Sequence, residues 1–465
     1  MTLSAADWAA LAGAIAGEVI RPGSPGYDEA RRPAIARFWD VRPQAVVRCR
    51  RPEDVAEVIS LARRSGIATA VRSGGHCFAG RSSTRGIVID VSPMSAVSVS
   101  AGVATVGAGA RLGDIAGALA RHRLAIPTGC GDNVGIAGLT LGGGLGILGR
   151  SHGLTCDKLL AAQVVLADGR VIDCDEHHEP ELFWALRGAG GGNFGVVTSL
   201  TFGTVPARAA TIFRLTWPRC HASRVIAAWQ DWAPAGPDEL AASLLVTAPV
   251  GGDRPVTVTV SGAMAGTEAD AERLLGDLAA RAGADPATAS LRHLPFWEAK
   301  RHLAVILPGD DRPLAHSFTK SEFFARPLPR RAIADLVGTL ELGRIASESR
   351  ELDFTPWGGA YNRVPPHATA FAHRDALFLL KHSVTVGAEA GAARRAAARR
   401  WLARSWASVH PCGTGGVYPN FPDPDLDKWP RAYHGKNYPR LLSVKASYDP
   451  EGFFRFPQSL PPDSA

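Results

Sequence analysis

Apolar and polar positions in the N-terminal part of the chain predict a strand–helix–strand unit. An apolar run at 45–48 is followed by Pro52 and two acidic residues, which favour a helix start, and then by apolar positions at helical spacing. Gly66 ends this helix, and a second apolar run covers 67–72. The loop 72–76 therefore follows the carboxyl end of a strand, where ligands bind in open α/β sheets.

Further elements are predicted in the same half of the chain. A β-branched run at 86–91 indicates a strand, and alternating segments at 97–107 and 164–173 indicate two hairpins. Residues 112–124 have the apolar spacing of a helix.

The pattern changes at Pro206. Beyond it, strands of alternating character are separated by helices such as 268–282. These strands are predicted at 212–217, 244–248, 256–261, 317–324 and 377–386. The layout predicts an α+β domain with a sheet covered on one face by helices. After His410 the chain becomes rich in Tyr, Pro, Asn and Asp again.

Glycine is concentrated in loops at 74–75, 142–146 and 188–195. Glycines in a loop supply turn conformations or let the backbone approach a ligand closely, with N–H groups aimed at phosphate oxygens. Turns alone explain one or two glycines, but not a buried run such as 142–146. The three loops together predict a large ligand that contains a pyrophosphate. Neither a P-loop nor GxGxxG after the first strand occurs.

Composition narrows the function classes. The 465 residues are 46% hydrophobic and 20% charged, which is typical of a soluble protein with two domains. The net charge of +7 comes from scattered arginines, so no nucleic-acid surface is predicted. The seven cysteines lack a CxxC pair, which argues against disulfides and structural zinc, and no metal site is expected. Without an export signal or an apolar run of membrane-spanning length, we expect a cytoplasmic protein that does not bind a membrane.

His76 directly follows the Gly74-Gly75 pair. A histidine in a glycine loop is most often an ordinary loop residue. Beside a predicted phosphate-binding loop it becomes a candidate nucleophile, because imidazole is neutral and reactive near pH 7.

As a set, the motifs resemble those of the berberine-bridge-enzyme-like flavoproteins, which belong to the p-cresol methylhydroxylase/vanillyl-alcohol oxidase superfamily of FAD proteins. They are RSGGH at 72–76, VGIAGL at 134–139 with LGGGLG at 141–146, LFWALRG at 182–188 with NFGVV at 193–197, and YHGKNYPRL at 433–441 with its continuation to Ser459. The matches span 45–205 and 418–460, while the middle matches only in layout.

The resemblance implies an α+β protein with a two-part FAD-binding domain of the p-cresol methylhydroxylase type. Residues 1–205 form its first part, and 411–465 return to it. Residues 206–410 then form a substrate domain with an antiparallel sheet covered by helices. The cofactor-binding residues implied in this way, besides His76, are Arg72, Ser73, Gly74, Gly75, Val134, Gly135, Gly138, Gly142, Gly143, Gly144, Gly146, Asn193, Gly195, Val196, Val197 and Asn437.

The resemblance also implies covalent attachment of FAD. The histidine of the RSGGH motif, here His76, bonds the flavin 8α-carbon in this family. In doubly linked members, a cysteine three residues before the Val-Gly pair bonds flavin C6. Gly131 holds that position here, and Cys130 precedes it. Cys130 either reaches the flavin because the loop absorbs one residue, or is a small buried thiol.

Two residues are implied on the substrate side. Tyr418 matches a tyrosine that often serves as base near the flavin. Lys381 falls where relatives keep a polar residue that points from the substrate sheet to the flavin ring. Strand alternation puts Lys381 and Ser383 on one face and His382 on the other. Lys381 is then expected to lower the pKa of Tyr418. An ordinary solvent-facing lysine is the alternative.

Three functions are compatible with these residues. The first is an oxidase that takes a hydride from an alcohol, sugar or secondary metabolite, with O₂ as acceptor and H₂O₂ as product. The second is a dehydrogenase of the same fold that reacts poorly with O₂. The third is a resistance protein that sequesters a drug without turnover. The expected partners are a small-molecule substrate and O₂, with no nucleic acid, in a monomer or homodimer.

Overall fold

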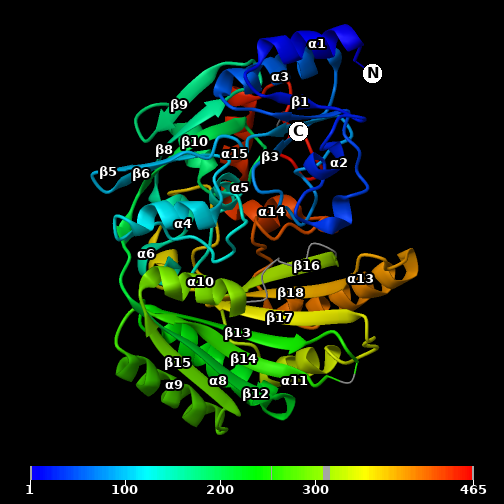
Figure 1. Ribbon diagram of the computed structural model, residues 1–465. Helices are drawn as coiled ribbons and strands as arrows, with labels where there is room; N and C mark the ends of the chain where they lie inside the picture. The colour runs from blue at the N-terminus through cyan, green and yellow to red at the C-terminus, as the bar shows by residue number, and fades with distance from the viewer. Residues whose placement is uncertain (1–2, 253, 307–314, 463–465) are drawn as a thin grey trace.

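Two sheet systems are stacked on each other in the computed structural model, which describes residues 3–252, 254–306 and 315–462 (Figure 1). The N-terminal system contains a four-stranded sheet of order β1-β2-β4-β3, in which β4 pairs in parallel with both β2 and β3. Its strands are β1 (Glu18–Ile20), β2 (Ala45–Arg48), β3 (Thr69–Arg72) and β4 (Ile87–Asp90). The predicted strand–helix–strand unit is present as β2, α3 and β3, with β4 between its strands.

Helix α3 shows why the N-terminal sequence folds as predicted. Pro52 occupies its first turn with Glu53 and Asp54, and Gly66 ends it with a φ of 61°. The helices and short strands of this part are α1 (Ala5–Ala14), α2 (Tyr27–Ala30), α3 (Pro52–Ser65), α4 (Leu112–Ala120), α5 (Ile136–Leu141), α6 (Gly149–His152), α7 (Pro180–Leu186), β7 (Leu124–Ala125) and β11 (Val205–Pro206). Helix α4 is shorter than predicted, because the chain turns at Arg123, whose φ is 54°.

A five-stranded antiparallel sheet of order β5-β6-β10-β8-β9 completes the N-terminal system. Its strands are β5 (Val97–Ser100), β6 (Val103–Gly107), β8 (Leu159–Val165), β9 (Val171–Asp175) and β10 (Val196–Gly203). Both predicted hairpins are confirmed by the pairs β5–β6 and β8–β9.

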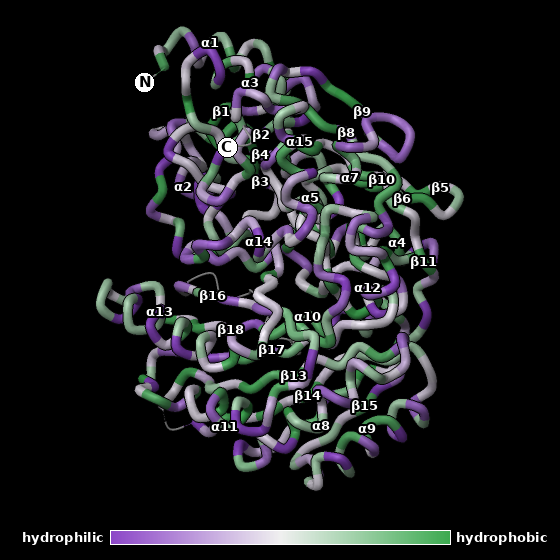
Figure 2. Tube along the Cα trace, turned by 180° about the vertical axis from the view of Figure 1, so that it is seen from behind, coloured by the Kyte–Doolittle hydropathy of each residue, from purple (hydrophilic) through white to green (hydrophobic). Residues whose placement is uncertain are grey.

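The middle of the chain forms a seven-stranded antiparallel sheet of order β15-β12-β14-β13-β17-β18-β16. Its strands are β12 (Ala210–Pro218), β13 (Leu240–Ala248), β14 (Thr257–Met264), β15 (Thr288–Leu294), β16 (Ala315–Phe324), β17 (Glu348–Pro356) and β18 (Phe378–Gly387). The helices are α8 (Ala222–Ala235), α9 (Glu268–Ala282), α10 (Phe296–Ile306), α11 (Arg330–Thr339), α12 (Ala360–Arg363) and α13 (Ala392–Ala407). The outer helices α9 and α11 show hydrophilic and hydrophobic positions in alternation (Figure 2).

The C-terminal segment returns to the N-terminal system through α14 (Trp429–His434) and α15 (Tyr438–Tyr448) (Figure 1). The remaining short helices are η1 (Ala36–Phe38), η2 (Thr155–Lys158), η3 (Arg219–His221), η4 (His410–Cys412) and η5 (Gly435–Asn437). Lys445 of α15 is fully buried, pairs with Asp449 at 2.5 Å and donates to the carbonyl of Asn193 at 2.6 Å. The end of the chain is thus tied to the loop that precedes β10.

Packing follows this arrangement. One apolar core contains residues of the N-terminal system together with Leu441, Val444, Phe454 and Leu460. A second contains the helix-covered face of the seven-stranded sheet. The proposed division at 205 and 410 separates these two cores except for Ala370, which belongs to the first, and the cores therefore support it. In the described part of the chain, every helix is too short or too polar to cross a bilayer.

Candidate active site

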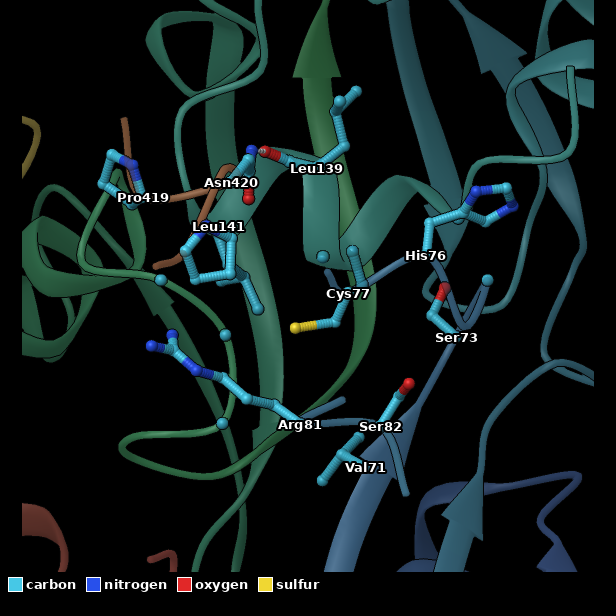
Figure 3. Close-up of a pocket in the computed structure, with 18 of the residues that line it drawn as sticks. Val71, Ser73, His76, Cys77, Arg81, Ser82, Leu139, Leu141, Pro419 and Asn420 are labelled. Carbon is cyan, nitrogen blue, oxygen red and sulfur yellow. Dashed lines mark hydrogen bonds between the residues drawn. The ribbon is translucent and has the colours of Figure 1, made fainter. Parts of the chain in front are cut away.

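A cavity of about 390 Å³ lies where the N-terminal system, the C-terminal segment and the seven-stranded sheet meet (Figure 3). Its wall combines the loop after β3, the start of α5, the loop before β10, residues 418–422 and 454–456, and Lys381 of β18. The volume falls within the range of small-molecule sites. Its lining is mostly apolar with a few polar groups, which is the usual character of such sites.

His76 lies in the cavity wall, on the loop that follows β3. Ser73 fixes the loop by donating from Oγ to the carbonyl of Ala108 at 2.7 Å. A β-carbon on Gly74 would lie 2.3 Å from the nitrogen of Gly135, so the two loops touch backbone to backbone. The side chains of His76 and its neighbour Cys77 leave the loop in opposite directions (Figure 3).

Arg72 does not line the cavity, although the motif implied contact with the cofactor. Its guanidinium is buried and donates to the backbone carbonyls of Ala30, Arg31 and Ser82. Arginine supplies several donors in a fixed fork, so one side chain can hold separate loops. Arg72 therefore supports these loops, and its contact with the cofactor stays a prediction.

The second motif divides into two parts. Val134, Gly135 and Gly138, at the start of α5, line the cavity. Apart from the chain neighbours of Gly138 and the backbone of its own helix, no heavy atom of the described residues lies within 4 Å of a β-carbon placed there, so this position is open. Leu139 and Leu141 add apolar wall from the same helix (Figure 3).

The glycines of 142–146 do not line the cavity, and protein atoms fill the space beside them. A β-carbon on Gly144 would lie 2.2 Å from Oγ1 of Thr155, and one on Gly146 would lie 2.0 Å from the carbonyl oxygen of Thr128. The packing gives this run a role other than the predicted close approach to a cofactor, which stays a prediction. These glycines instead allow segments of the protein to pack closely.

Gly142 and Gly143 belong to the same packing arrangement. A β-carbon on Gly142 would lie 2.2 Å from Oδ1 of Asn420. One on Gly143, whose φ is 118°, would lie 3.0 Å from the Phe371 ring and 3.4 Å from the Tyr418 ring. The run therefore seats the C-terminal segment that carries Tyr418.

The loop before β10 contains the glycines that face the cavity. Gly195 and Val197 line it, together with the glycines at 190–192, which the motif comparison did not single out. Asn193 and Val196 do not. Asn193 accepts a hydrogen bond from the nitrogen of Leu460 at 3.2 Å, and Val196 is buried in the sheet. Both residues support the loop, and their role as ligands stays a prediction.

Asn437 is also a supporting residue. Its Nδ2 donates to the carbonyl of Pro366 at 2.8 Å and lies near the carbonyls of Thr369 and Ala370, and it is absent from the cavity wall. The conformation of the 366–370 segment thus depends on the C-terminal motif.

Cys130 lies outside the cavity wall, although its neighbour Gly129 is part of it. The thiol packs among apolar residues such as Ile212 and Leu303 and is 9% exposed. Burial raises the pKa of Cys130, against a smaller opposite influence of Lys300. Of the two interpretations of Cys130, these contacts favour a small buried thiol over a residue that forms a second bond to the flavin.

Tyr418 lines the cavity and is 1% exposed. Its hydroxyl oxygen accepts hydrogen bonds from the nitrogen of Gly144 at 2.9 Å and from Nδ2 of Asn420 at 3.1 Å. Asn420 is fixed in turn by donating to the carbonyl of Leu139 at 2.9 Å (Figure 3). Burial outweighs these donors and raises the pKa of Tyr418 to about 12, opposite to the lowering expected from Lys381.

Lys381 lines the same cavity and is not an ordinary solvent-facing residue, since its side chain is 19% exposed. Its Nζ lies 3.1 Å from Oδ2 of Asp353 and 3.8 Å from Oε1 of Glu351, both on β17. The ammonium also lies 5.3 Å from the ring centre of Phe421. His382 points to the opposite face and contacts Ser405 of α13 at 2.9 Å, so the predicted alternation is confirmed.

Sequence reasoning missed Arg81, Asn420 and Phe421, which all line the cavity. Asn420 and Phe421 follow Tyr418 closely, and this spacing was a usable signal. Arg81 had no signal, because a lone arginine after a glycine loop is usually a surface residue. Within the described ranges, no cluster of His, Cys, Asp or Glu is suited to a metal ion.

These groups fit a long ligand with a planar apolar part and an anionic part. Val71, Leu139, Leu141 and Val197 supply apolar wall, while Arg81 and the open glycines supply positive charge and backbone donors. The Nε of Arg81 is buried and has no hydrogen-bond partner within the described part of the chain, so this donor is available to a ligand. FAD has both parts.

Comparisons with known proteins agree with this chemistry. Residues 43–175 match the family described as FAD binding domain, and 417–461 match the family described as berberine and berberine like. The chain is 35% identical to the uncharacterized FAD-linked oxidoreductase YgaK of Bacillus subtilis strain 168, over 96% of this chain and 97% of that one. It is 30% identical to (R)-6-hydroxynicotine oxidase of Paenarthrobacter nicotinovorans, over 97% and 98% of the two chains.

A solved structure of glucooligosaccharide oxidase from Acremonium strictum, described with a 6-S-cysteinyl, 8α-N1-histidyl FAD, superimposes with a TM-score of 0.88. It is 26% identical and covers 99% of this chain and 100% of its own. Fold, motifs and identity over nearly the whole length lead to one assignment. The chain belongs to the berberine bridge enzyme-like family of FAD-dependent oxidoreductases.

Proposed function

We propose that this protein is an oxidase that removes a hydride from an alcohol, a sugar or a related secondary metabolite, holds FAD covalently through His76, and reduces O₂ to H₂O₂. The observation that carries the proposal is the meeting of His76, Tyr418 and Lys381 in the wall of one cavity, although they come from distant parts of the chain. FAD supplies the hydride acceptor and the route of electrons to O₂.

His76 is the proposed anchor of the cofactor. It lies on a loop whose backbone is fixed by the contact of Gly74 with Gly135, so its position in the wall is well defined. Imidazole is neutral near pH 7 and nucleophilic, which suits attack on an electrophilic carbon. The glucooligosaccharide oxidase structure, with its histidyl FAD, supports this choice.

Tyr418 is the proposed proton acceptor. As the substrate C–H bond breaks, its electron pair leaves as hydride. The proton of the substrate hydroxyl passes to the ionised oxygen of Tyr418, and a C=O bond forms in the product. The N–H groups of Gly144 and Asn420 point at that oxygen and stabilise its ionised form. The raised pKa of about 12 means that the ionised form is scarce at neutral pH, so we expect faster turnover at alkaline pH.

The ion pairs around Lys381 favour a polar substrate. Lys381, Asp353 and Glu351 form an ion-paired group on neighbouring strands, and none of them is more than 21% exposed. Such a group offers both donors and acceptors to hydroxyl groups of a substrate. An apolar substrate would displace water from these polar atoms without offering them hydrogen bonds in return, which is costly.

The test begins with acid precipitation of the purified holoprotein. We expect a yellow precipitate from the wild type and a colourless one from His76→Ala, with FAD in the supernatant. A colourless wild-type precipitate would contradict the covalent link but not FAD binding. A panel of alcohols, glycosides and amines is then screened for anaerobic bleaching of the flavin and for H₂O₂ in air.

Each outcome of the screen separates the three functions. Bleaching with stoichiometric H₂O₂ supports the oxidase. Bleaching with slow reoxidation in air indicates a dehydrogenase. Tight binding of a drug-like compound with no bleaching by any substrate indicates sequestration, and either of the last two results overturns the proposal.

A further inference from the structure

Arg81 is held in the cofactor cavity by aromatic contacts. Its guanidinium carbon lies 4.7 Å from the ring centre of Phe456 and 5.9 Å from that of Tyr433. One terminal nitrogen donates to Oε1 of Gln458 at 3.0 Å. Stacking and one hydrogen bond fix the plane of the guanidinium, while its Nε stays buried with no hydrogen-bond partner among the residues described. A fixed cation with an unused donor is a preformed anion site.

The glycines at 190–192 lie beside this cation. A β-carbon on Gly192 would contact the Phe456 ring at 3.4 Å, which places Gly192 next to the ring that supports Arg81. Gly190 and Gly192 have φ values of 91° and 83° on either side of Gly191. Alternation of this kind turns successive backbone N–H groups toward one concave surface that binds anions.

The position of Arg81 in the cavity indicates which part of the cofactor it faces. Figure 3 shows its guanidinium and the imidazole of His76 at opposite sides of the cavity. If His76 anchors the flavin ring, as the proposed function requires, Arg81 faces the part of FAD beyond the ring. The diphosphate is the anionic group there.

We propose that Arg81, together with the backbone at 190–192, binds the diphosphate of FAD. Arginine suits this role because its planar fork matches two phosphate oxygens at once. The C-terminal segment then contributes to cofactor binding indirectly, because Phe456 and Gln458 hold the guanidinium in place. Arg81 thus joins two elements distant in sequence around one ligand group.

The experiment measures binding and does not depend on a substrate. In a His76→Ala holoprotein, the dissociation constant of FAD is measured by fluorescence, with ADP and riboflavin as competitors. Arg81→Met is expected to weaken the binding of both FAD and ADP by about 10- to 100-fold, which is the loss typical of a hydrogen bond to a charged group. Riboflavin, which lacks phosphate, is expected to bind equally well to the proteins with and without Arg81→Met. If His76 forms no covalent bond, the same assay works on the wild type, so the two proposals fail separately.

Arg455→Met is the matched control, since Arg455 also lines the cavity and the charge change is the same. An equal loss of ADP binding in this control would mean a general charge effect and would overturn the subsite. Weaker binding of riboflavin by Arg81→Met, with unchanged binding of ADP, would place the guanidinium at the flavin ring and would also overturn the proposed subsite. If Arg81→Met does not fold, Arg81→Lys keeps the charge but loses the fork. Unchanged ADP binding in that variant would contradict the proposal, and weaker ADP binding would support it.

Discussion

The glycine runs at 142–146 and 188–195 look alike in sequence but differ in what surrounds them. Beside the first, hypothetical β-carbons on Gly144 and Gly146 come within 2.2 Å of protein atoms. Beside the second, the glycines at 190–192 leave at least 3.4 Å to the nearest protein atom, and they line the cavity. The first run packs protein against protein, whereas the middle of the second run, between the packed Gly188 and Gly195, is open to the cavity. Glycine density therefore indicates close approach, but not what approaches.

The largest expected effect concerns Tyr418, which the first run holds through the nitrogen of Gly144. We expect Tyr418→Phe to slow anaerobic flavin reduction by about 10²- to 10⁴-fold, the usual worth of general-base help, while FAD content stays the same. Because burial raises the pKa of Tyr418 to about 12, the wild-type rate should rise with pH throughout the range in which the protein is folded. Stopped-flow reduction at several pH values checks both points. A wild-type rate in the variant would place the base elsewhere.

The two runs should respond differently to the same substitution. Gly144→Ala creates a clash with Thr155 at a φ of 86°, so we expect a loss of about 2–5 kcal/mol in the free energy of unfolding. Gly190→Ala, at a φ of 91°, meets no protein atom closer than 4.0 Å and should cost only about 1–2 kcal/mol. Urea unfolding of both variants measures the difference. Equal losses would remove the distinction between the runs.

Buried histidines should make the packed regions sensitive to acid. Burial lowers the pKa of His373 to about 4 and the pKa values of His382 and His434 to about 3, from an ordinary 6.5. The unfolded chain then binds more protons below pH 6.5, so stability is full above that pH and falls as the pH drops toward 4.

Each histidine contributes about 1.4 kcal/mol per pH unit in that window. His382→Asn should remove one such contribution from the pH slope of urea unfolding. His122→Gln, at an exposed position, is the control and should leave the slope unchanged. An identical slope in His382→Asn would mean that this imidazole is not neutral in the folded protein.

The smallest effect is expected at Cys130, which lies just outside the cavity wall. Cys130→Ala should leave the flavin absorption spectrum unchanged, and mass spectrometry of a wild-type digest should find flavin on the His76 peptide alone. A flavin that joins two peptides would show that the loop moves Cys130 to the ring.

Sequence predicted the elements whose apolar pattern is plain and missed those whose pattern is hidden. Strand β15 was not predicted because most of its residues are exposed and lack an apolar face. Strand β17 alternates perfectly in burial, but buries the ion-paired Glu348 and Arg350 where apolar residues would be expected. A buried charge that is paired looks like a surface residue in the sequence.

The candidate site was predictable in its motifs but not in its division of roles. The motif around His76 gave the loop and its position in the wall. It also implied that Arg72 touches the cofactor, whereas the guanidinium holds backbone carbonyls. Which side of a loop a side chain takes depends on what packs behind it, and in this site those neighbours come from distant segments.

The tie between Lys445 and the carbonyl of Asn193 has a consequence for biosynthesis. The wall of the cavity needs residues 454–456, which are synthesised long after the loops at 73–76 and 190–192. The N-terminal segment is therefore made long before its cavity is complete, although domains usually fold as they emerge. The cavity can then be complete only after the C-terminal segment has been made, and a chain truncated before α15 would lack this part of the wall.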